Sequence, residues 1–203
     1  MHRYLQFVVV VGLASATSTP VPASAQWAQF RGSNAGDVSD DPELPETWSE
    51  TENVVWKVDV PGLSWSSPVI WEDTIFLTSA ISAGTEPDPI PGLYDPGDDN
   101  GATRSSQTHR WVVYNIDFRT GAVRWERELH SAAPGIARHI KNSFASETPV
   151  TDGRRVYVYF GTAGMVGALN MSGETVWLTE LGAYETTGGF GSAASPTLHG
   201  DRL

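Results

Sequence analysis

A short basic segment between two β-rich regions carries the residue types best suited to chemistry. Arg138, His139, Lys141 and Asn142 lie close together in the sequence, directly before an expected first strand. In one interpretation, Arg138 and Lys141 bind a carboxylate or phosphate while His139 acts as an acid or base. In the other, the segment only bonds the backbone of its neighbours and fills the rim of the fold. The four residues are ligand-binding candidates, and the sequence assigns no catalytic residue.

A second polar cluster lies in a stretch rich in proline, glycine and acidic residues. Asp95, Asp98, Asp99 and Asn100 precede Gly101, and oxygen side chains of this kind are the ligands that Ca²⁺ prefers. In an EF-hand loop, however, the ligands alternate and glycine takes the sixth position, and this stretch has neither property. The sequence therefore predicts a solvated acidic loop and no metal site.

These candidates must be positioned by β-strands. The region 146–181 predicts four short strands joined by tight turns, because β-branched and aromatic runs alternate with glycine-containing turn pairs. Asn170 and Gly173 fix the last hairpin, since the asparagine side chain bonds nearby backbone N–H groups and glycine supplies a positive φ. Trp177 on the last strand has more apolar surface than one small sheet covers, so it requires a neighbouring sheet.

The same pattern recurs along the chain. The segment Asn115–Trp125 repeats the turn and last strand found in Ala168–Trp177. The Thr148-Pro149 opening is repeated upstream as Ser67-Pro68 and downstream as Ser195-Pro196. An interval of about 50 residues, with four strands in each repeat, is typical of β-propeller blades, and the first strands of such blades line a central channel.

The repeated motif resembles the blade of PQQ-like (pyrroloquinoline-quinone-like) propellers, which reads Ala-x-Asp-x-x-Thr-Gly-x-x-x-Trp after a Ser-Pro-Val opening. The positions of this chain that carry the motif are Trp56, Asp117, Gly121, Trp125, Asn170, Gly173 and Trp177. The resemblance implies that these residues are structural and that the tryptophans pack between blades. It also relates the chain to BamB-like outer-membrane assembly factors and to the quinoprotein alcohol dehydrogenases.

Two segments precede the expected propeller. Residues 1–25 have a short apolar core and a small-residue cleavage site ending at Ala25, as a secretory signal peptide does. Residues 26–52 form an arm without strand periodicity, in which Trp27 and Phe30 are expected to attach the arm to the propeller. The sequence therefore predicts export to the periplasm or the medium.

The predicted fold class is all-β, with four-stranded antiparallel blades in an incomplete ring over residues 53–203. Its expected parts are a closing strand at 53–60, a blade at 65–129 with a loop insertion at 81–108, a blade at 146–181, and the start of a third at 193–203. Because a closed ring needs about four to eight blades, we expect the chain to be the N-terminal part of a longer protein.

Composition excludes several function classes. The formal net charge of −11 leaves no basic surface for nucleic acid. The absence of cysteine excludes disulfides and a lipoprotein anchor. No apolar run reaches the ~20 residues that a transmembrane helix requires.

Two functions fit this description. The first is an exported, non-catalytic binding or assembly scaffold without a cofactor, whose partner is a protein or glycan of the cell envelope. The alternative is a PQQ- and calcium-dependent quinoprotein dehydrogenase acting on alcohols or sugars, with most of its site in blades beyond this chain. The sequence favours the scaffold, because the repeat tryptophans serve in packing and the vicinal disulfide of the alcohol-oxidising branch cannot form.

Overall fold

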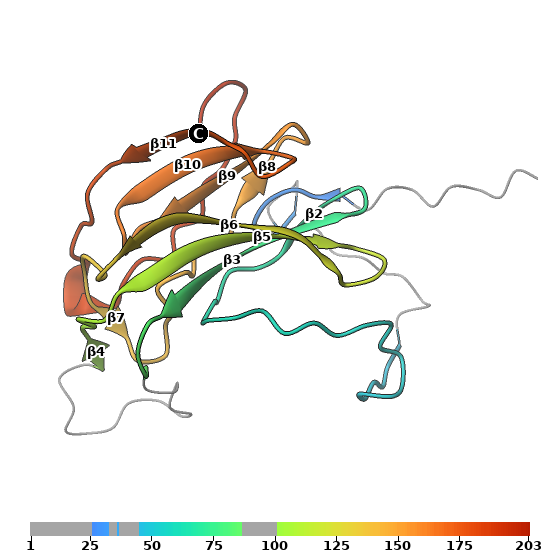
Figure 1. Cartoon of the computed structure of the whole chain (residues 1–203), viewed down its shortest axis with the longest axis horizontal. Coiled ribbons are helices and arrows are strands. Elements are labelled where there is room, and N and C mark those ends of the chain that lie inside the picture. The colour runs from blue at the N-terminus through green and yellow to red at the C-terminus, as the bar shows by residue number, and fades with distance from the viewer. Residues whose placement is uncertain (1–25, 33–35, 37–44, 87–100) are drawn as a thin grey trace, which may run out of the picture.

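The computed structural model describes residues 26–32, 36, 45–86 and 101–203. The expected signal peptide and the acidic cluster Asp95–Asn100 lie outside these residues. In the described part, every regular element but one short 3-10 turn is a β-strand, and all strand pairs are antiparallel (Figure 1). The elements are β1 (Gln26–Trp27), β2 (Val69–Trp71), β3 (Thr74–Ser82), β4 (Ala102–Thr103), β5 (His109–Asp117), β6 (Val123–Ala132), β7 (Arg138–His139), β8 (Val150–Thr151), β9 (Arg155–Phe160), β10 (Met165–Asn170), β11 (Thr175–Glu180) and η1 (Thr187–Gly189).

The strands form two main sheets, neither of which closes on itself. The first sheet has the order β1-β2-β3-β5-β6, and the second has the order β11-β10-β9-β8. The all-β expectation is confirmed, and the second sheet is the predicted four-stranded meander. The first sheet gains an extra strand, because β1 of the N-terminal arm pairs with β2 and places Gln26 opposite Trp71. The next arm residue, Ala28, accepts a 2.9 Å hydrogen bond from Thr151 N on β8, so the arm joins both sheets.

The main hydrophobic core lies between the two sheets. Phe76 and Val113 come from the first sheet, and Val158 and Leu169 come from the second. All four are almost fully buried. Alternate residues of each strand point to this core, which is the period that strands of a half-buried sheet require.

Two tryptophan side chains make the same contact with the part of the fold that follows them: the indole N–H bonds a backbone carbonyl and the ring packs on a turn glycine. Trp56 Nε1 donates a 3.0 Å hydrogen bond to the carbonyl of Phe118, and its ring lies against Gly121 at the β5–β6 turn. A Cβ at Gly121 would come within 2.5 Å of that ring, and the backbone there has φ = 72°. Only glycine satisfies both the close approach and the left-handed backbone.

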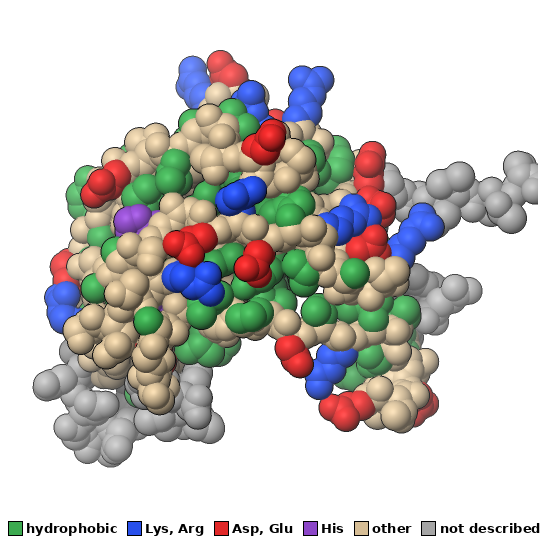
Figure 2. Space-filling view, viewed as in Figure 1, with side chains coloured by type: hydrophobic (Ala, Val, Ile, Leu, Met, Phe, Trp, Pro, Cys, Tyr) green, Lys and Arg blue, Asp and Glu red, His purple; other side chains and the backbone are tan. Residues whose placement is uncertain are grey.

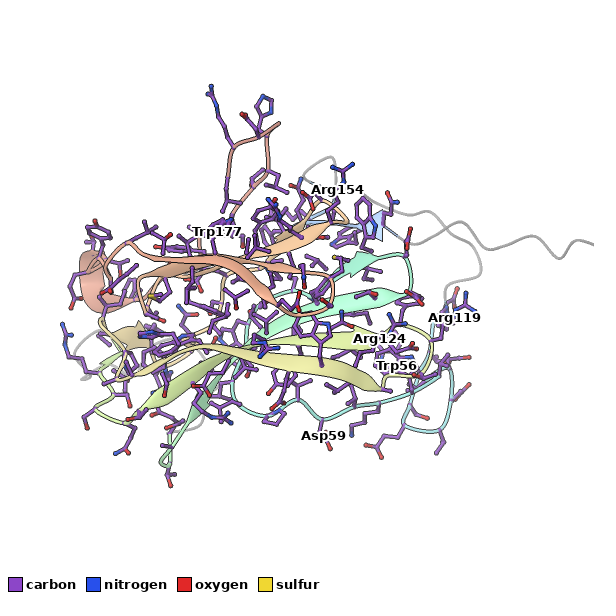
Figure 3. All side chains as sticks on the ribbon, turned by 45° about the horizontal axis from the view of Figure 1, so that its top comes forward. Trp56, Asp59, Arg119, Arg124, Arg154 and Trp177 are labelled. Carbon is purple, nitrogen blue, oxygen red and sulfur yellow. The ribbon has the colours of Figure 1, made fainter. Side chains whose placement is uncertain are left out.

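The contact repeats one unit further on. Trp125 on β6 donates a 3.0 Å hydrogen bond to the carbonyl of Met171 and packs on Gly173, where φ is 86°. Trp177 occupies the third equivalent position on β11. Its ring lies 6.4 Å from that of Tyr157, and its indole N–H has no hydrogen-bond partner among the residues described. Trp56 and Trp177 lie on opposite sides of the two stacked sheets (Figure 3).

The turns that receive these tryptophans are shaped by the residue type predicted for them. Asp117 accepts hydrogen bonds from the backbone N–H groups of Arg119 and Thr120, and Asn170 accepts them from Ser172 and Glu174. Each side chain therefore holds its own turn in place. The Arg124 guanidinium also bonds Asp117 and holds the pKa of that carboxyl well below its usual range.

A second repeated contact joins the segments that open each unit. Ser67 N donates a 3.0 Å hydrogen bond to the hydroxyl of Thr148. Thr148 N donates a 2.9 Å hydrogen bond to the hydroxyl of Ser195. Each Ser/Thr-Pro opening is thus bonded to the next one along the chain. Residues 195–203 therefore begin beside the second sheet, in the same way that the second sheet begins beside the first.

One expectation needs correction, and two expected strands form no ladder here. Residues 53–60 are extended and pack on the first sheet through Trp56, Val58 and Val60, but they form no strand ladder within the described part of the chain. The third repeat shows only an isolated bridge between His199 and Arg202. Neither segment has a partner strand among the described residues, and an extended segment without a partner makes no ladder. The insertion 81–108 is also not all loop, because β3 runs to Ser82 and β4 pairs with β7.

The tryptophan contact predicts unequal effects of two matched substitutions. Trp125→Ala removes a hydrogen bond and an apolar contact between the sheets, and we expect it to lower the free energy of unfolding by about 3 kcal/mol. Trp177→Ala removes neither, and we expect a loss below about 1 kcal/mol. Urea denaturation followed by circular dichroism measures both values, and equal losses would show that the contact is not what joins the sheets.

Candidate functional site

Three connecting segments meet at one end of the two sheets. They are the β3–β5 connection, the β6–β8 connection and residues 181–194, and we call their described surface the loop face. Ala102 pairs with His139, and Thr103 pairs with Arg138. His139 N donates a 3.1 Å hydrogen bond to the carbonyl of Phe190. In Figure 1, β4, β7 and η1 accordingly gather at the same end of the molecule.

Arg138, a predicted ligand-binding residue, is buried in the loop face with 1% of its surface exposed. Its Nη1 donates to three carbonyl oxygens in the residues that follow it, the shortest of these bonds being 2.8 Å to Asn142 O. Its Nη2 lies 3.3 Å from Glu86 Oε2. The guanidinium therefore fixes the path of the β6–β8 connection and ties it to the β3–β5 connection.

Glu86 is the centre of a buried polar cluster that sequence reasoning missed. Its Oε1 accepts hydrogen bonds from Ser105 Oγ at 2.8 Å and from Ser82 Oγ at 3.3 Å. His109 Nε2 lies 3.3 Å from the same oxygen. His109 Nδ1 lies 2.9 Å from Gln107 O, and because a carbonyl only accepts, this nitrogen carries the proton. No sequence signal pairs Glu86 with His109 or Arg138, since the fold alone brings these distant positions together.

A pocket of about 260 Å³ opens beside this cluster. Glu86, His109 and Arg138 form its polar wall. Leu63, Ile81 and Phe144 form the apolar part of its lining. The Arg138 guanidinium lies 5.0 Å from the centre of the Phe144 ring, and the His109 ring meets that ring edge-on at 4.8 Å. The pocket is therefore shaped by side chains that hold one another in place.

The other three predicted residues lie on the same connection but outside the pocket lining. Asn142 Nδ2 donates a 2.9 Å hydrogen bond to Phe190 O, and its Oδ1 accepts from Ser143 N at 2.9 Å. His139 Nδ1 accepts a 3.1 Å hydrogen bond from Lys141 N. The structure thus brings the four candidates together along one backbone segment, but only Arg138 reaches the pocket.

Large aromatic side chains are exposed around the loop face. Tyr184 is 73% exposed, Trp65 47% and Phe190 41%. The Trp65 indole donates to the carbonyl of Lys141, and Phe190 packs edge-on against His139, so both flank the same connection. Exposed aromatic rings on an ordered backbone are typical of surfaces that bind partners.

A second buried acid lies where the sheets meet residues 181–194. Glu147 is 1% exposed, and its carboxylate accepts hydrogen bonds from Gly161 N at 3.0 Å and Ser146 N at 3.2 Å. Ser192 also hydrogen-bonds the carboxyl group. Burial raises the pKa of Glu147 to about 7, because these bonds only partly offset the loss of water around the charge.

Other classes of site find little support in the described residues. They contain no group of three or more His, Asp or Glu side chains that could hold a metal ion. No helix among them is long and apolar enough to cross a membrane. On the face shown in Figure 2, acidic and basic side chains are interspersed, and no basic patch for nucleic acid is seen there.

Comparisons with known proteins add no identification. No family model matches the chain, and no curated protein matches it. The interpretation of the loop face therefore rests on its own geometry.

The contacts of Arg138 predict that it stabilises the fold. Arg138→Met leaves Glu86 buried without its cation and three carbonyl groups without their donor, and we expect a loss of about 3–5 kcal/mol in the free energy of unfolding. Arg104→Met is the matched control, because the Arg104 side chain is two-thirds exposed and pairs with Glu185, which is also exposed. Its expected loss is below about 1 kcal/mol. Chemical denaturation compares the two variants, and a small effect at Arg138 would contradict its structural role.

The raised pKa of Glu147 predicts a stability that falls as pH rises. The folded protein holds this proton up to about pH 7, whereas the unfolded chain releases it near the ordinary value of 4.5. The folded state therefore binds more protons between these values, and the stabilisation present below pH 4.5 is lost as the pH approaches 7. We expect the loss to be on the order of 3 kcal/mol. Glu147→Gln cannot titrate, so its unfolding free energy should show a smaller decrease over pH 5–8, and parallel curves would contradict the assignment.

Proposed function

We propose that the chain is part of a PQQ-like β-propeller and that it acts as an exported, non-catalytic binding scaffold in the cell envelope. The repeated contact from tryptophan to the carbonyl of the next unit supports the propeller assignment, because it joins segment 53–60 to the first sheet and the first sheet to the second in the same way. The hydroxyl contacts between the Ser/Thr-Pro openings also repeat. In a β-propeller the same rotation relates each blade to the next, so the contacts between blades are expected to repeat.

The observation that carries the binding function is the exposure of aromatic side chains on a loop face whose segments are hydrogen-bonded to one another. The polar candidates of this face are mainly engaged in holding it together, as the bonds of Arg138 and Asn142 show. Tyr184 and Phe190, in contrast, present large ring surfaces to solvent. A face with fixed backbone and exposed rings suits recognition of a protein or glycan, since little conformational freedom is lost on binding.

The dehydrogenase alternative requires a ring that stacks on the quinone and oxygen ligands for calcium. Trp56 packs on the first sheet and Trp125 lies between the two sheets, and each has its indole N–H bonded to a carbonyl. The described residues offer no cluster of acidic or histidine side chains for the ion. These residues do not fit PQQ with calcium, and no catalytic step is assigned to them.

The scaffold proposal predicts that partner binding depends on the exposed rings. We expect alanine at both Tyr184 and Phe190 to weaken retardation of the protein in gels containing neutral polysaccharides, such as glucomannan and xylan, by about tenfold in apparent Kd. Alanine at both Val176 and Leu178 is the control, because these side chains are also exposed but lie on β11, outside the loop face.

The same variants separate the possible outcomes. If polysaccharides do not retard the protein, a photo-crosslinker at position 184 that captures one envelope protein, only while Phe190 is present, assigns a protein partner. Binding that both ring variants retain in full would overturn the role of the loop face. Saturable PQQ binding with dye-linked alcohol oxidation would replace the scaffold by the enzyme.

A further inference from the structure

A second pocket lies between the N-terminal arm and the start of the third repeat. Its volume is about 430 Å³, within the range of roughly 300–1,000 Å³ for small-molecule sites. Gln29, Phe30 and Arg31 form one wall, and residues 193–195 and Thr197 form the other. Both walls are bonded to the opening of the second sheet, because Ala28 O accepts from Thr151 N and Ser195 Oγ accepts from Thr148 N.

Arg31 lies in a tight turn of the first wall. Its φ of 64° is in the left-handed region, which is unfavourable for a residue with a side chain. Gln29 closes the turn twice, because its carbonyl accepts from Gly32 N and its Nε2 donates to Gly32 O, each at 3.0 Å. The turn therefore fixes where the Arg31 side chain leaves the backbone. Backbone strain of this kind is concentrated at functional sites.

The Arg31 guanidinium is oriented by an aromatic ring and remains accessible. It lies over the Phe30 ring, 5.2 Å from the ring centre. This cation–π contact occupies one face of the planar group and leaves its N–H edges open. No hydrogen bond or ion pair joins these N–H groups to another described residue. Because Arg31 is exposed to solvent, a ligand can reach them.

The opposite wall adds hydroxyl groups and apolar surface. Ser195 Oγ already accepts the hydrogen bond from Thr148 N, so its own proton is available for a second partner. Thr197 contributes another hydroxyl, and Ala193 and Ala194 contribute methyl groups. None of the described lining residues is acidic. The pocket thus combines one cation and hydroxyl donors with a small apolar surface.

From these observations we propose that the pocket at Arg31 binds a small monocarboxylate, presented by a free organic acid or by the C-terminal end of a peptide. A carboxylate matches two N–H groups on one edge of a guanidinium, and its single charge is balanced by the single arginine. A phosphate monoester carries more charge, and the described lining residues include no second cation for it. The apolar part of the ligand lies against Phe30 and the two alanines.

Matched small ligands test the proposal on the full chain. Saturation-transfer NMR and calorimetry compare phenylacetate with its neutral analogue phenylacetamide and with phenyl phosphate. N-acetylphenylalanine and its amide represent a peptide end. We expect phenylacetate to bind with millimolar Kd, at least about tenfold more tightly than phenylacetamide, and to lose affinity as the salt concentration rises.

The pattern of binding distinguishes the sources and can overturn the proposal. Tighter binding of N-acetylphenylalanine than of phenylacetate assigns a peptide end, and the reverse order assigns a free acid. Equal binding of each acid and its amide would overturn the proposal. Tighter binding of phenyl phosphate, or no binding of either carboxylate, would do the same.

Variants at Arg31 then locate the site. Arg31→Gln should weaken phenylacetate binding at least about tenfold, whereas Arg119→Gln removes the same charge from an exposed turn outside the pocket and should change nothing. Arg31→Gly also removes the charge but relieves the left-handed backbone, so it should abolish binding without lowering the melting temperature. A purely structural arginine would instead destabilise the fold when removed. Unchanged affinity in both Arg31 variants would overturn the proposed position of the ligand.

The outcome is separable from that of the scaffold proposal. Alanine at both Tyr184 and Phe190 should leave phenylacetate affinity unchanged, since neither side chain lines this pocket. If no carboxylate binds but ring-dependent binding of a polysaccharide or protein persists, the pocket inference fails and the scaffold function stands.

Discussion

The structure depends on a limitation of small β-sheets, which cannot cover a large aromatic ring by themselves. Trp56 and Trp125 are each covered by the turn that follows in the next part of the fold, which supplies a glycine surface for the ring and a carbonyl for the indole N–H. The indole N–H makes this contact directional, because apolar burial alone would allow the sheets to slide. Stacking of the sheets then places their connecting segments at the same end, and the loop face is a consequence of that stacking.

The polar groups of the loop face are governed by the cost of burying charge. Arg138 and Glu86 lie close to each other because neither could be buried alone, and their pairing joins two connections that are far apart in sequence. Glu147 shows the other solution: it is buried without a cation among the contacts described and holds its proton up to a higher pH. One acid therefore contributes a fixed ion pair to the loop face, and the other contributes a group whose charge depends on pH.

The sequence predicts the parts of this structure that depend on local pattern. The strand runs, the turns at Asp117 and Asn170 and the role of Trp125 all follow from residue types at fixed spacing. The same reasoning singled out Arg138 as a ligand-binding candidate, whereas in the structure its guanidinium bonds backbone carbonyls and Glu86. It could not find Glu86, because no spacing rule relates residues that only the fold brings together. It also predicted a strand at 53–60, where the residue pattern is right but no partner strand lies beside it. Strands and turns can be predicted from the sequence, whereas contacts between residues far apart in the chain can be identified only from the structure.

The N-terminal arm has a consequence for the order in which the molecule is assembled. Its first described residues bond β2 of the first sheet, and Ala28 then bonds Thr151 of the second sheet. Because a chain is synthesised from its N-terminal end, the arm cannot take its place until residues much later in the sequence have also been made. This early segment is thus among the last to reach its final position, and its attachment marks the moment at which both sheets are in place.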